Sequence, residues 1–125
     1  MAHEIYWMKP GAVLYVNYKG EQTVETIIAC LDDMAAQLDT VDHPVVVLIN
    51  WNEVTDTEPG ALLKVQGHRA YSHPMAARGV LVGFPKQARF ENEVTAVRTR
   101  GDKNTRYFDS MDEALDYLRE MLAGT

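Results

Sequence analysis

Polar and acidic side chains are concentrated in residues 50–59, and several of them could do chemistry. The segment offers amides, hydroxyls and carboxylates, namely Asn50, Asn52, Glu53, Thr55, Asp56, Thr57 and Glu58. Oxygen ligands of this kind suit a divalent cation, but their spacing lacks the Asp-x-Asp-x-Asp-Gly pattern of calcium loops. Short polar residues of this type more commonly form turns and helix caps. The segment therefore predicts a binding loop, and no metal-ligating residue is predicted.

The histidines and the single cysteine do not form a catalytic pattern. His68 and His73 are five residues apart, a spacing that does not place two side chains on one helical face. Cys30 lies beside the apolar stripe of an expected helix, where a small thiol packs as a hydrophobic residue. The glycine-rich dinucleotide, phosphate-loop, Gly-x-Ser-x-Gly and His-Glu-x-x-His motifs are all missing from the sequence. We therefore predict no catalytic residues and no cofactor.

Length and composition limit the class of protein that carries this segment. The 125 residues are enough for one domain with its own core, and 46% of them are hydrophobic. No apolar run approaches the roughly 20 residues that a membrane-spanning helix needs, and the N-terminus lacks a secretory pattern. One Cys excludes an internal disulfide. We expect one soluble cytoplasmic domain over residues 1–125.

The net charge of −6 conceals three blocks of alternating sign. Residues 1–63 carry a net −8, residues 64–106 a net +6 and residues 107–125 a net −4. The basic block could attract an anionic partner. Its candidate contacts are Arg69, Lys86 and Arg89. The alternative is that adjacent acidic and basic segments pair on the surface. Nucleic acid is not a predicted partner, because the overall charge has the wrong sign and the bases are not interleaved with aromatics.

Hydrophobic periodicity predicts an alternation of strands and helices. Alternating or unbroken apolar runs indicate strands at residues 3–8, 12–18, 45–49, 79–84 and 105–108. Amphipathic patterns indicate helices at residues 24–38, 59–71, 87–98 and 111–122. Thr23 is the expected cap of the first helix and Pro59 the first residue of the second, while Phe90, Val94 and Val97 are expected to face inward from the third. The order β-β-α-β-α-β-α-β-α predicts an α/β domain with a mostly parallel five-stranded sheet and helices packed on it.

A parallel sheet would bring the polar segment to one end of the molecule. Ligands of open α/β sheets bind at the carboxyl ends of the strands, where the following helices begin. The segments expected at that end are residues 19–23, 50–59, 84–87 and 109–110. The loop 50–59 is the longest and most polar of them, so it is our first choice for a binding surface. An exposed Trp51 would be its contact residue, because tryptophan is enriched at interface hot spots; packing against the next helix is the alternative.

The layout resembles the STAS domain, named for sulfate transporters and anti-sigma factor antagonists. The resemblance rests on the second strand ending Tyr18-Lys19-Gly20, the apolar strand VVVLIN, the loop 50–60 and the junction at residues 107–115. It spans nearly the whole chain and is nearest to the anti-sigma-factor-antagonist-like group, which is often grouped with CRAL-TRIO lipid-binding domains. It implies a non-catalytic regulatory module that binds a partner protein.

One position departs from the STAS pattern. Regulatory STAS domains carry a phosphorylated Ser or Thr immediately before the glycine of this loop, whereas here Pro59 precedes Gly60. Proline has no hydroxyl, Glu58 is already negative, and Thr55 and Thr57 stand at other positions. The resemblance therefore implies a phosphorylation switch that is absent or moved.

Three functions remain open at the level of sequence. The first is binding of a protein partner through residues 50–59 and the helix that follows. The second is binding of an apolar or anionic small ligand, such as a lipid, because Met and Phe can line a pocket and the basic block can attract headgroups. The third is an enzyme, which would need convergent polar groups in a closed pocket. A homodimer through the short first strand is also possible, since that strand is expected at a sheet edge.

Overall fold

The computed structural model describes residues 2–65, 67–100 and 105–123, with the side chains of 95–100 excepted. The predicted order of elements is confirmed. The strands are β1 (His3–Lys9), β2 (Val13–Gln22), β3 (Val45–Thr57), β4 (Ala76–Val82) and β5 (Thr105–Phe108). The helices are α1 (Val24–Leu38), α2 (Ala61–Lys64), α3 (Lys86–Arg100) and α4 (Met111–Ala123).

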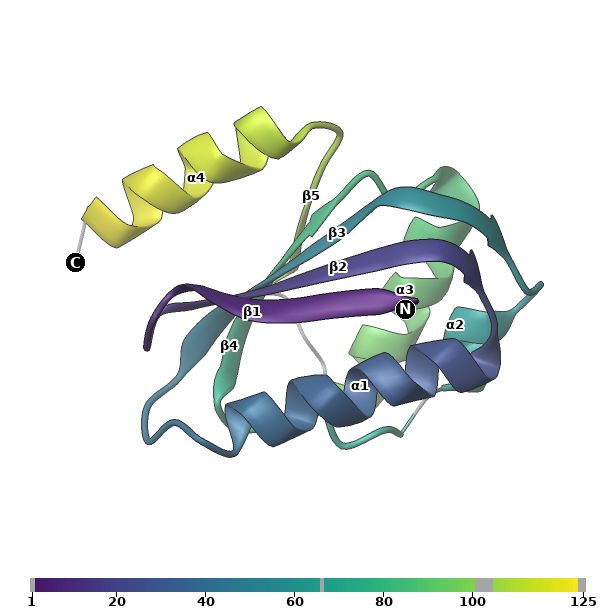
Figure 1. Cartoon of the computed structure of the whole chain (residues 1–125), viewed down its shortest axis with the longest axis horizontal. Helices are drawn as coiled ribbons and strands as arrows, with labels where there is room; N and C mark the ends of the chain where they lie inside the picture. Colours follow the sequence, from purple (N-terminus) through teal and green to yellow (C-terminus); the bar gives the residue numbers. More distant parts are fainter. Residues whose placement is uncertain (1, 66, 101–104, 124–125) are drawn as a thin grey trace.

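The five strands form one mixed sheet in the order β1-β2-β3-β4-β5. β1 and β2 are antiparallel, and the other neighbouring pairs are parallel, as predicted. Helices α1, α2 and α3 pack on one face, whereas α4 packs on the other (Figure 1). Each strand alternates its side chains between these two faces. The core therefore has two layers, and the larger one lies between the sheet and α1.

Helix α1 begins where the sequence predicts, at the Thr23 cap. The Thr23 hydroxyl accepts a hydrogen bond from the Thr26 N–H at 3.2 Å, and the Thr26 hydroxyl accepts one from the Thr23 N–H at 2.8 Å. This reciprocal pair satisfies two backbone donors that the first turn would otherwise leave unpaired. The buried stripe of the helix places Ile27, Cys30, Leu31, Met34, Ala35 and Leu38 against the sheet.

The prediction of a loop at residues 50–58 is wrong, because β3 continues as a strand to Thr57. β2 also runs four residues past Tyr18, the last residue of the predicted strand, so the two strands pair as far as Gln22 and Thr57. The polar residues gave no clear period-2 pattern because the pairing shifts register twice over this stretch. Such β-bulges change which face a side chain points to.

The second and third helices also differ from the prediction. α2 is a four-residue helix that begins after Gly60, so Pro59 precedes it, and Gly67 at φ +86° lies in the turns that follow. In α3, Phe90 is 58% exposed rather than inward-facing, whereas Glu91 and Asn92 are buried. Val94 is half-buried, and the Val97 side chain lies outside the described residues. Both buried polar side chains have partners: Glu91 accepts a hydrogen bond from the Gln87 amide, and the Asn92 amide donates one to the Tyr107 hydroxyl at 3.1 Å.

Gly83 ends β4 and sets the position of α3. Its backbone has φ +74°, a left-handed conformation that glycine adopts readily. A Cβ added at this position would lie 2.0 Å from the Asn52 Oδ1 atom. Any larger residue would therefore force the Asn52 side chain to move, in addition to straining the left-handed backbone.

Gly83→Ala should lower the free energy of unfolding by more than the about 1–2 kcal/mol expected for left-handed backbone alone. Gly20→Ala is the matched control, because Gly20 has φ +70° and nothing lies within 4 Å of an added Cβ. Urea unfolding of both variants measures the difference. Adding Asn52→Ala to Gly83→Ala should recover the excess loss, and equal losses for the two alanine variants would show that the contact with Asn52 does not matter.

Candidate functional site

A surface cleft of about 500 Å³ opens between the second half of β3 and the start of α3. One wall is formed by residues 51–52 and 54–57 of β3 and the two residues that follow, and the opposite wall by the β4–α3 turn and the first turns of α3. Six of the eight residues predicted for the binding surface line it, namely Trp51, Asn52, Thr55, Asp56, Thr57 and Glu58. The other lining residues are Val54, Pro59, Leu62, Gly83, Pro85, Gln87, Ala88 and Glu91. Most of the predicted surface therefore gathers in one place, although as a strand rather than as a loop.

Trp51 is buried, so the prediction of an exposed contact residue is wrong. Its side chain is 3% exposed and its ring centroid lies 4.8 Å from those of both Tyr18 and Phe84. Trp51 points to the face of the sheet that α1, α2 and α3 cover, where an indole buries a large apolar area. It forms the inner wall of the cleft and supports the strand that carries the polar residues.

Asn50 and Glu53 do not line the cleft. The Asn50 side-chain amide donates a hydrogen bond to the Tyr15 hydroxyl at 3.0 Å, and the Asn17 amide donates one to Glu53 Oε2 at 2.6 Å. Tyr15 belongs to the core layer under α4, which places this polar row on the opposite face of the sheet. The predicted set is thus divided between the two faces.

The cleft is acidic. Asp56, Glu58 and Glu91 line it, and its lining includes no Lys, Arg or His. A hydrogen bond from the Val24 N–H and one from Lys64 lower the pKa of Glu58, so this carboxylate stays charged at neutral pH. Glu91 is buried and accepts a hydrogen bond from the Gln87 amide at 2.8 Å. The cleft therefore presents negative charge to whatever enters it.

The sequence reasoning missed Glu91 as a residue of the site. The segment 84–87 was expected at the same end of the sheet, because it follows the carboxyl end of a strand. Glu91 lies four residues after Gln87, one helical turn further along the same face, so this spacing could have added it to the residues expected at that end. The apolar pattern predicts that Phe90, Val94 and Val97 face inward, so Glu91 is not predicted to be buried.

Over the length of the cleft, no strand among the described residues pairs with β3 on one of its two sides. Its pairing with β4 ends at Asn50 and Val82, whereas its pairing with β2 continues to Thr57 and Gln22. From Trp51 to Thr57, β3 is thus an edge strand on the side that faces the cleft. The Thr57 N–H is satisfied by Asp56 Oδ1 at 2.9 Å, a local hydrogen bond typical of backbone without a neighbouring strand.

The three basic candidates for an anionic partner have separate surroundings. Arg69 makes a two-pronged ion pair with Asp39, at 3.0 and 2.7 Å. Arg89 lies over the Tyr107 ring, with its guanidinium carbon 4.7 Å from the ring centroid, and one of its nitrogens is 3.9 Å from Asp109. Lys86 is exposed at the first residue of α3. No common anion-binding patch is formed by these contacts.

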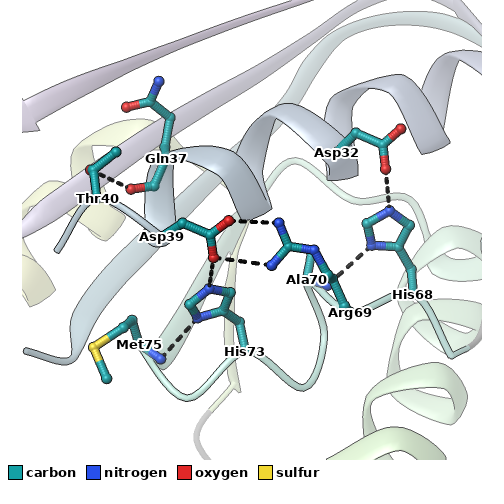
Figure 2. Close-up of polar contacts among 9 residues, drawn as sticks. All are labelled: Asp32, Gln37, Asp39, Thr40, His68, Arg69, Ala70, His73 and Met75. Carbon is teal, nitrogen blue, oxygen red and sulfur yellow. Dashed lines mark hydrogen bonds and ion pairs between the residues drawn. The ribbon is translucent and has the colours of Figure 1, made fainter. Parts of the chain in front are cut away.

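The acidic and basic segments pair, which was the alternative reading of the charge blocks. Figure 2 shows Asp32 of α1 and Asp39, the residue that follows this helix, facing the turns after α2. His68 Nε2 lies 2.7 Å from Asp32, and His73 Nε2 lies 2.8 Å from Asp39. Both histidines accept a backbone N–H at Nδ1, so the hydrogen-bond network assigns their proton to Nε2. Among the described residues, no group of three or more His, Cys, Asp or Glu could hold a metal ion.

A small internal cavity lies on the same side of the sheet as the cleft. Its volume is about 60 Å³, and its aromatic lining includes Tyr18, Trp51, Tyr71 and Phe84. Burial raises the pKa of Tyr18 well above its ordinary value, and burial also raises the pKa of Cys30 to about 12. The Cys30 thiol therefore stays protonated at neutral pH, consistent with its predicted role as a core residue.

Comparison with known proteins identifies the fold. No family model and no curated protein matches the sequence. The chain is similar to the crystal structure of an uncharacterized protein of the DUF3478 family with a SpoIIAA-like fold from Shewanella loihica PV-4. That likeness has 21% identity and a TM-score of 0.59, and it covers 94% of this chain and 92% of that one.

It is also similar to the anti-sigma factor antagonist SpoIIAA in its unphosphorylated form, with 18% identity, a TM-score of 0.56 and coverage of 94% and 98% of the two chains. The fold is therefore the STAS-like fold that the sequence layout resembles. None of the described helices is long and apolar enough to cross a membrane.

Asp39→Asn should lower Tm at pH 7 by a few degrees, because Arg69 and His73 lose their shared carboxylate. Hydrogen bonds from Arg69 and His73 lower the pKa of Asp39 in the folded state. A lowered carboxyl pKa stabilises the fold above its unfolded value near 4 and stops doing so as the pH falls through the folded value. The difference in Tm between wild type and variant should therefore shrink below about pH 4.

Asp42→Asn is the matched control, since the Asp42 side chain is 99% exposed and bonds only the neighbouring His43 among the contacts described. Thermal unfolding followed by circular dichroism from pH 2 to 7 measures both variants. An Asp39→Asn effect no larger than that of Asp42→Asn would contradict a structural role for the ion pair.

Proposed function

We propose that this chain is a non-catalytic regulatory module that binds a partner protein through the cleft beside β3. The observation that carries the proposal is the acidic cleft of about 500 Å³ at the carboxyl end of β3. This is the end of an α/β sheet where ligands usually bind. Supporting it, the fold is STAS-like, and the SpoIIAA structure it resembles is that of an anti-sigma factor antagonist. The cleft lining holds neither His nor Cys, so it offers no obvious nucleophile–base pair.

The proposed module works without phosphorylation at the position before Gly60. Pro59 occupies that position and is exposed on the rim of the cleft. Glu58, beside it, already supplies a negative charge that is held by Lys64 at 3.2 Å. Thr55 and Thr57 line the cleft, but their hydroxyls are not at the matching place. The binding surface would then be constitutively charged, and its regulation would come from the availability of the partner.

A photo-crosslinking experiment tests the partner surface. Replacing Thr55 by benzoylphenylalanine places a crosslinker on the exposed rim of the cleft. Glu120 on α4 is the matched control, because it is also exposed and lies on the helix that covers the opposite face of the sheet. In its native cells, the protein should form one discrete adduct from position 55 that position 120 does not give, and Asp56→Lys should reduce that adduct. No adduct at 55, or equal adducts at both positions, would contradict the proposal.

A second candidate function is favoured by the aromatic cavity, which could hold a small apolar ligand. Its volume of about 60 Å³ is well below the roughly 150 Å³ of an apolar cavity that binds benzene. With the turns at residues 67–75 in place, the cavity therefore has no room for a lipid chain. A ligand there would be of a few heavy atoms.

Native mass spectrometry of freshly purified protein tests this second candidate. A small bound mass that is lost on Ala70→Leu would support it, because Ala70 lines the cavity and a larger side chain would fill the space. A clean ligand-free mass for the wild type would count against it. A bound mass retained by Ala70→Leu would place the ligand elsewhere.

A further inference from the structure

We propose that the cleft binds an extended, Lys- or Arg-bearing segment of the partner, which adds as a strand to the free edge of β3. This inference rests on the proposed partner-binding function and specifies its mode. Three observations carry it: the missing strand neighbour of β3, the charge of the cleft and the apolar residues of its inner walls.

The first observation is the strand edge itself. Between Trp51 and Thr57, β3 pairs with β2 on one side only. These seven residues make about 20 Å of edge at the usual rise per residue. An unpaired edge presents backbone N–H and C=O groups that another extended chain can pair with. Two N–H groups of this stretch already have side-chain acceptors, because the Asn52 N–H donates to Asn50 Oδ1 and the Thr57 N–H to Asp56 Oδ1, each at 2.9 Å. Any such donor that faces the cleft would exchange its side-chain acceptor for a carbonyl of the bound segment. Because this edge borders the cleft, a chain bound in the cleft lies beside those groups.

Two β-bulges make this edge of β3 unsuitable for continuous pairing with a long strand. The register between β2 and β3 shifts on the β3 side between Asn50 and Glu53 and again between Val54 and Asp56. Bulges twist an edge and interrupt a continuous ladder, which is a common defence against edge-to-edge aggregation. The edge therefore suits a short segment that follows the cleft better than a long strand of a second copy.

The second observation is charge. Three carboxylates line the cleft, of which Glu58 is paired with Lys64 at 3.2 Å and Glu91 is buried. Asp56 is exposed, so it supplies most of the negative charge that a partner can reach. The Asp56 Oδ1 atom now accepts the Thr57 N–H at 2.9 Å. A segment paired with this edge would bring its own backbone N–H donors close to Asp56. A Lys or Arg side chain of that segment could then form an ion pair with the Asp56 carboxylate. Electrostatic complementarity of this kind favours basic partners and rejects acidic ones.

The third observation is the apolar component of the cleft. Val54, Leu62, Pro85 and Ala88 contribute to its lining alongside Trp51. Strand addition places alternate side chains of the bound segment on opposite sides. One set can therefore contact these apolar residues while the other reaches the carboxylates. The expected segment alternates basic and apolar residues and lacks proline, which cannot donate to a ladder.

Selection from a displayed library of short linear peptides of random sequence tests the inference on the intact protein. Enriched sequences should be rich in Lys and Arg and poor in Pro. Synthetic versions should lose about tenfold in affinity on Asp56→Lys and be unaffected by Glu120→Lys on the exposed surface of α4. Methylation of alternate peptide nitrogens should abolish binding, and amide NMR shifts should map to residues 51–57.

Enrichment of acidic sequences, no enrichment at all, or binding unaffected by N-methylation would overturn strand addition. A protein dimer that dissociates on Asp56→Lys would also overturn it and assign the cleft to a second copy of the chain. These outcomes are distinguishable from failure of the proposed function. A partner crosslinked from position 55 together with a failed peptide selection would leave partner binding in place and remove only this mode.

Discussion

The cleft in this molecule depends on the difference in length between two neighbouring strands. β3 runs to Thr57, supported throughout by β2, whereas β4 ends at Val82. Gly83 takes the chain away from the sheet in a left-handed turn, and Pro85 lies between this turn and the start of α3. β3 therefore continues alone on that side, and the space that β4 would have filled becomes the cleft. The position of Trp51 follows from the same cause, because β3 holds its side chain toward the covered face.

Much of the fold could be predicted from the sequence, because the apolar patterns of the sheet and of α1 are strong. The unbroken run Val45–Ile49, the Thr23 cap and the strand Thr105–Phe108 each predicted an element that the structure contains. The second half of β3 could not be predicted, since its polar residues resemble a loop and only pairing with β2 makes them a strand. Long-range pairing of this kind leaves no local pattern. The second half of the helix predicted over residues 59–71 instead forms turns, in which His68 Nδ1 accepts the Ala70 N–H.

The charged residues form two separate groups, the ion pairs beside α1 and the carboxylates of the cleft. The basic residues after α2 hold the acidic face of α1 through Arg69–Asp39 and the two histidine contacts, which accounts for part of the opposition between the charge blocks. The carboxylates of the cleft are different: Glu58 is paired with Lys64, but among the described contacts Asp56 makes no ion pair. Surface pairs such as Arg69–Asp39 contribute modestly to stability. The acidic cleft is instead the surface that we propose selects the partner.

Hydrogen exchange of backbone amides, resolved by NMR, tests the central feature of this account most directly. The Glu58 N–H donates to the Gln22 carbonyl at 2.8 Å, which marks the end of β2–β3 pairing. We expect this amide and the β2-facing amides of residues 51–57 to exchange slowly. The cleft-side amides should exchange quickly, apart from any contribution of Asn52 and Thr57, whose N–H groups bond Asn50 and Asp56. Uniformly fast exchange over residues 51–58 would mean that the segment is a loop, and it would contradict both the free strand edge and the binding mode built on it.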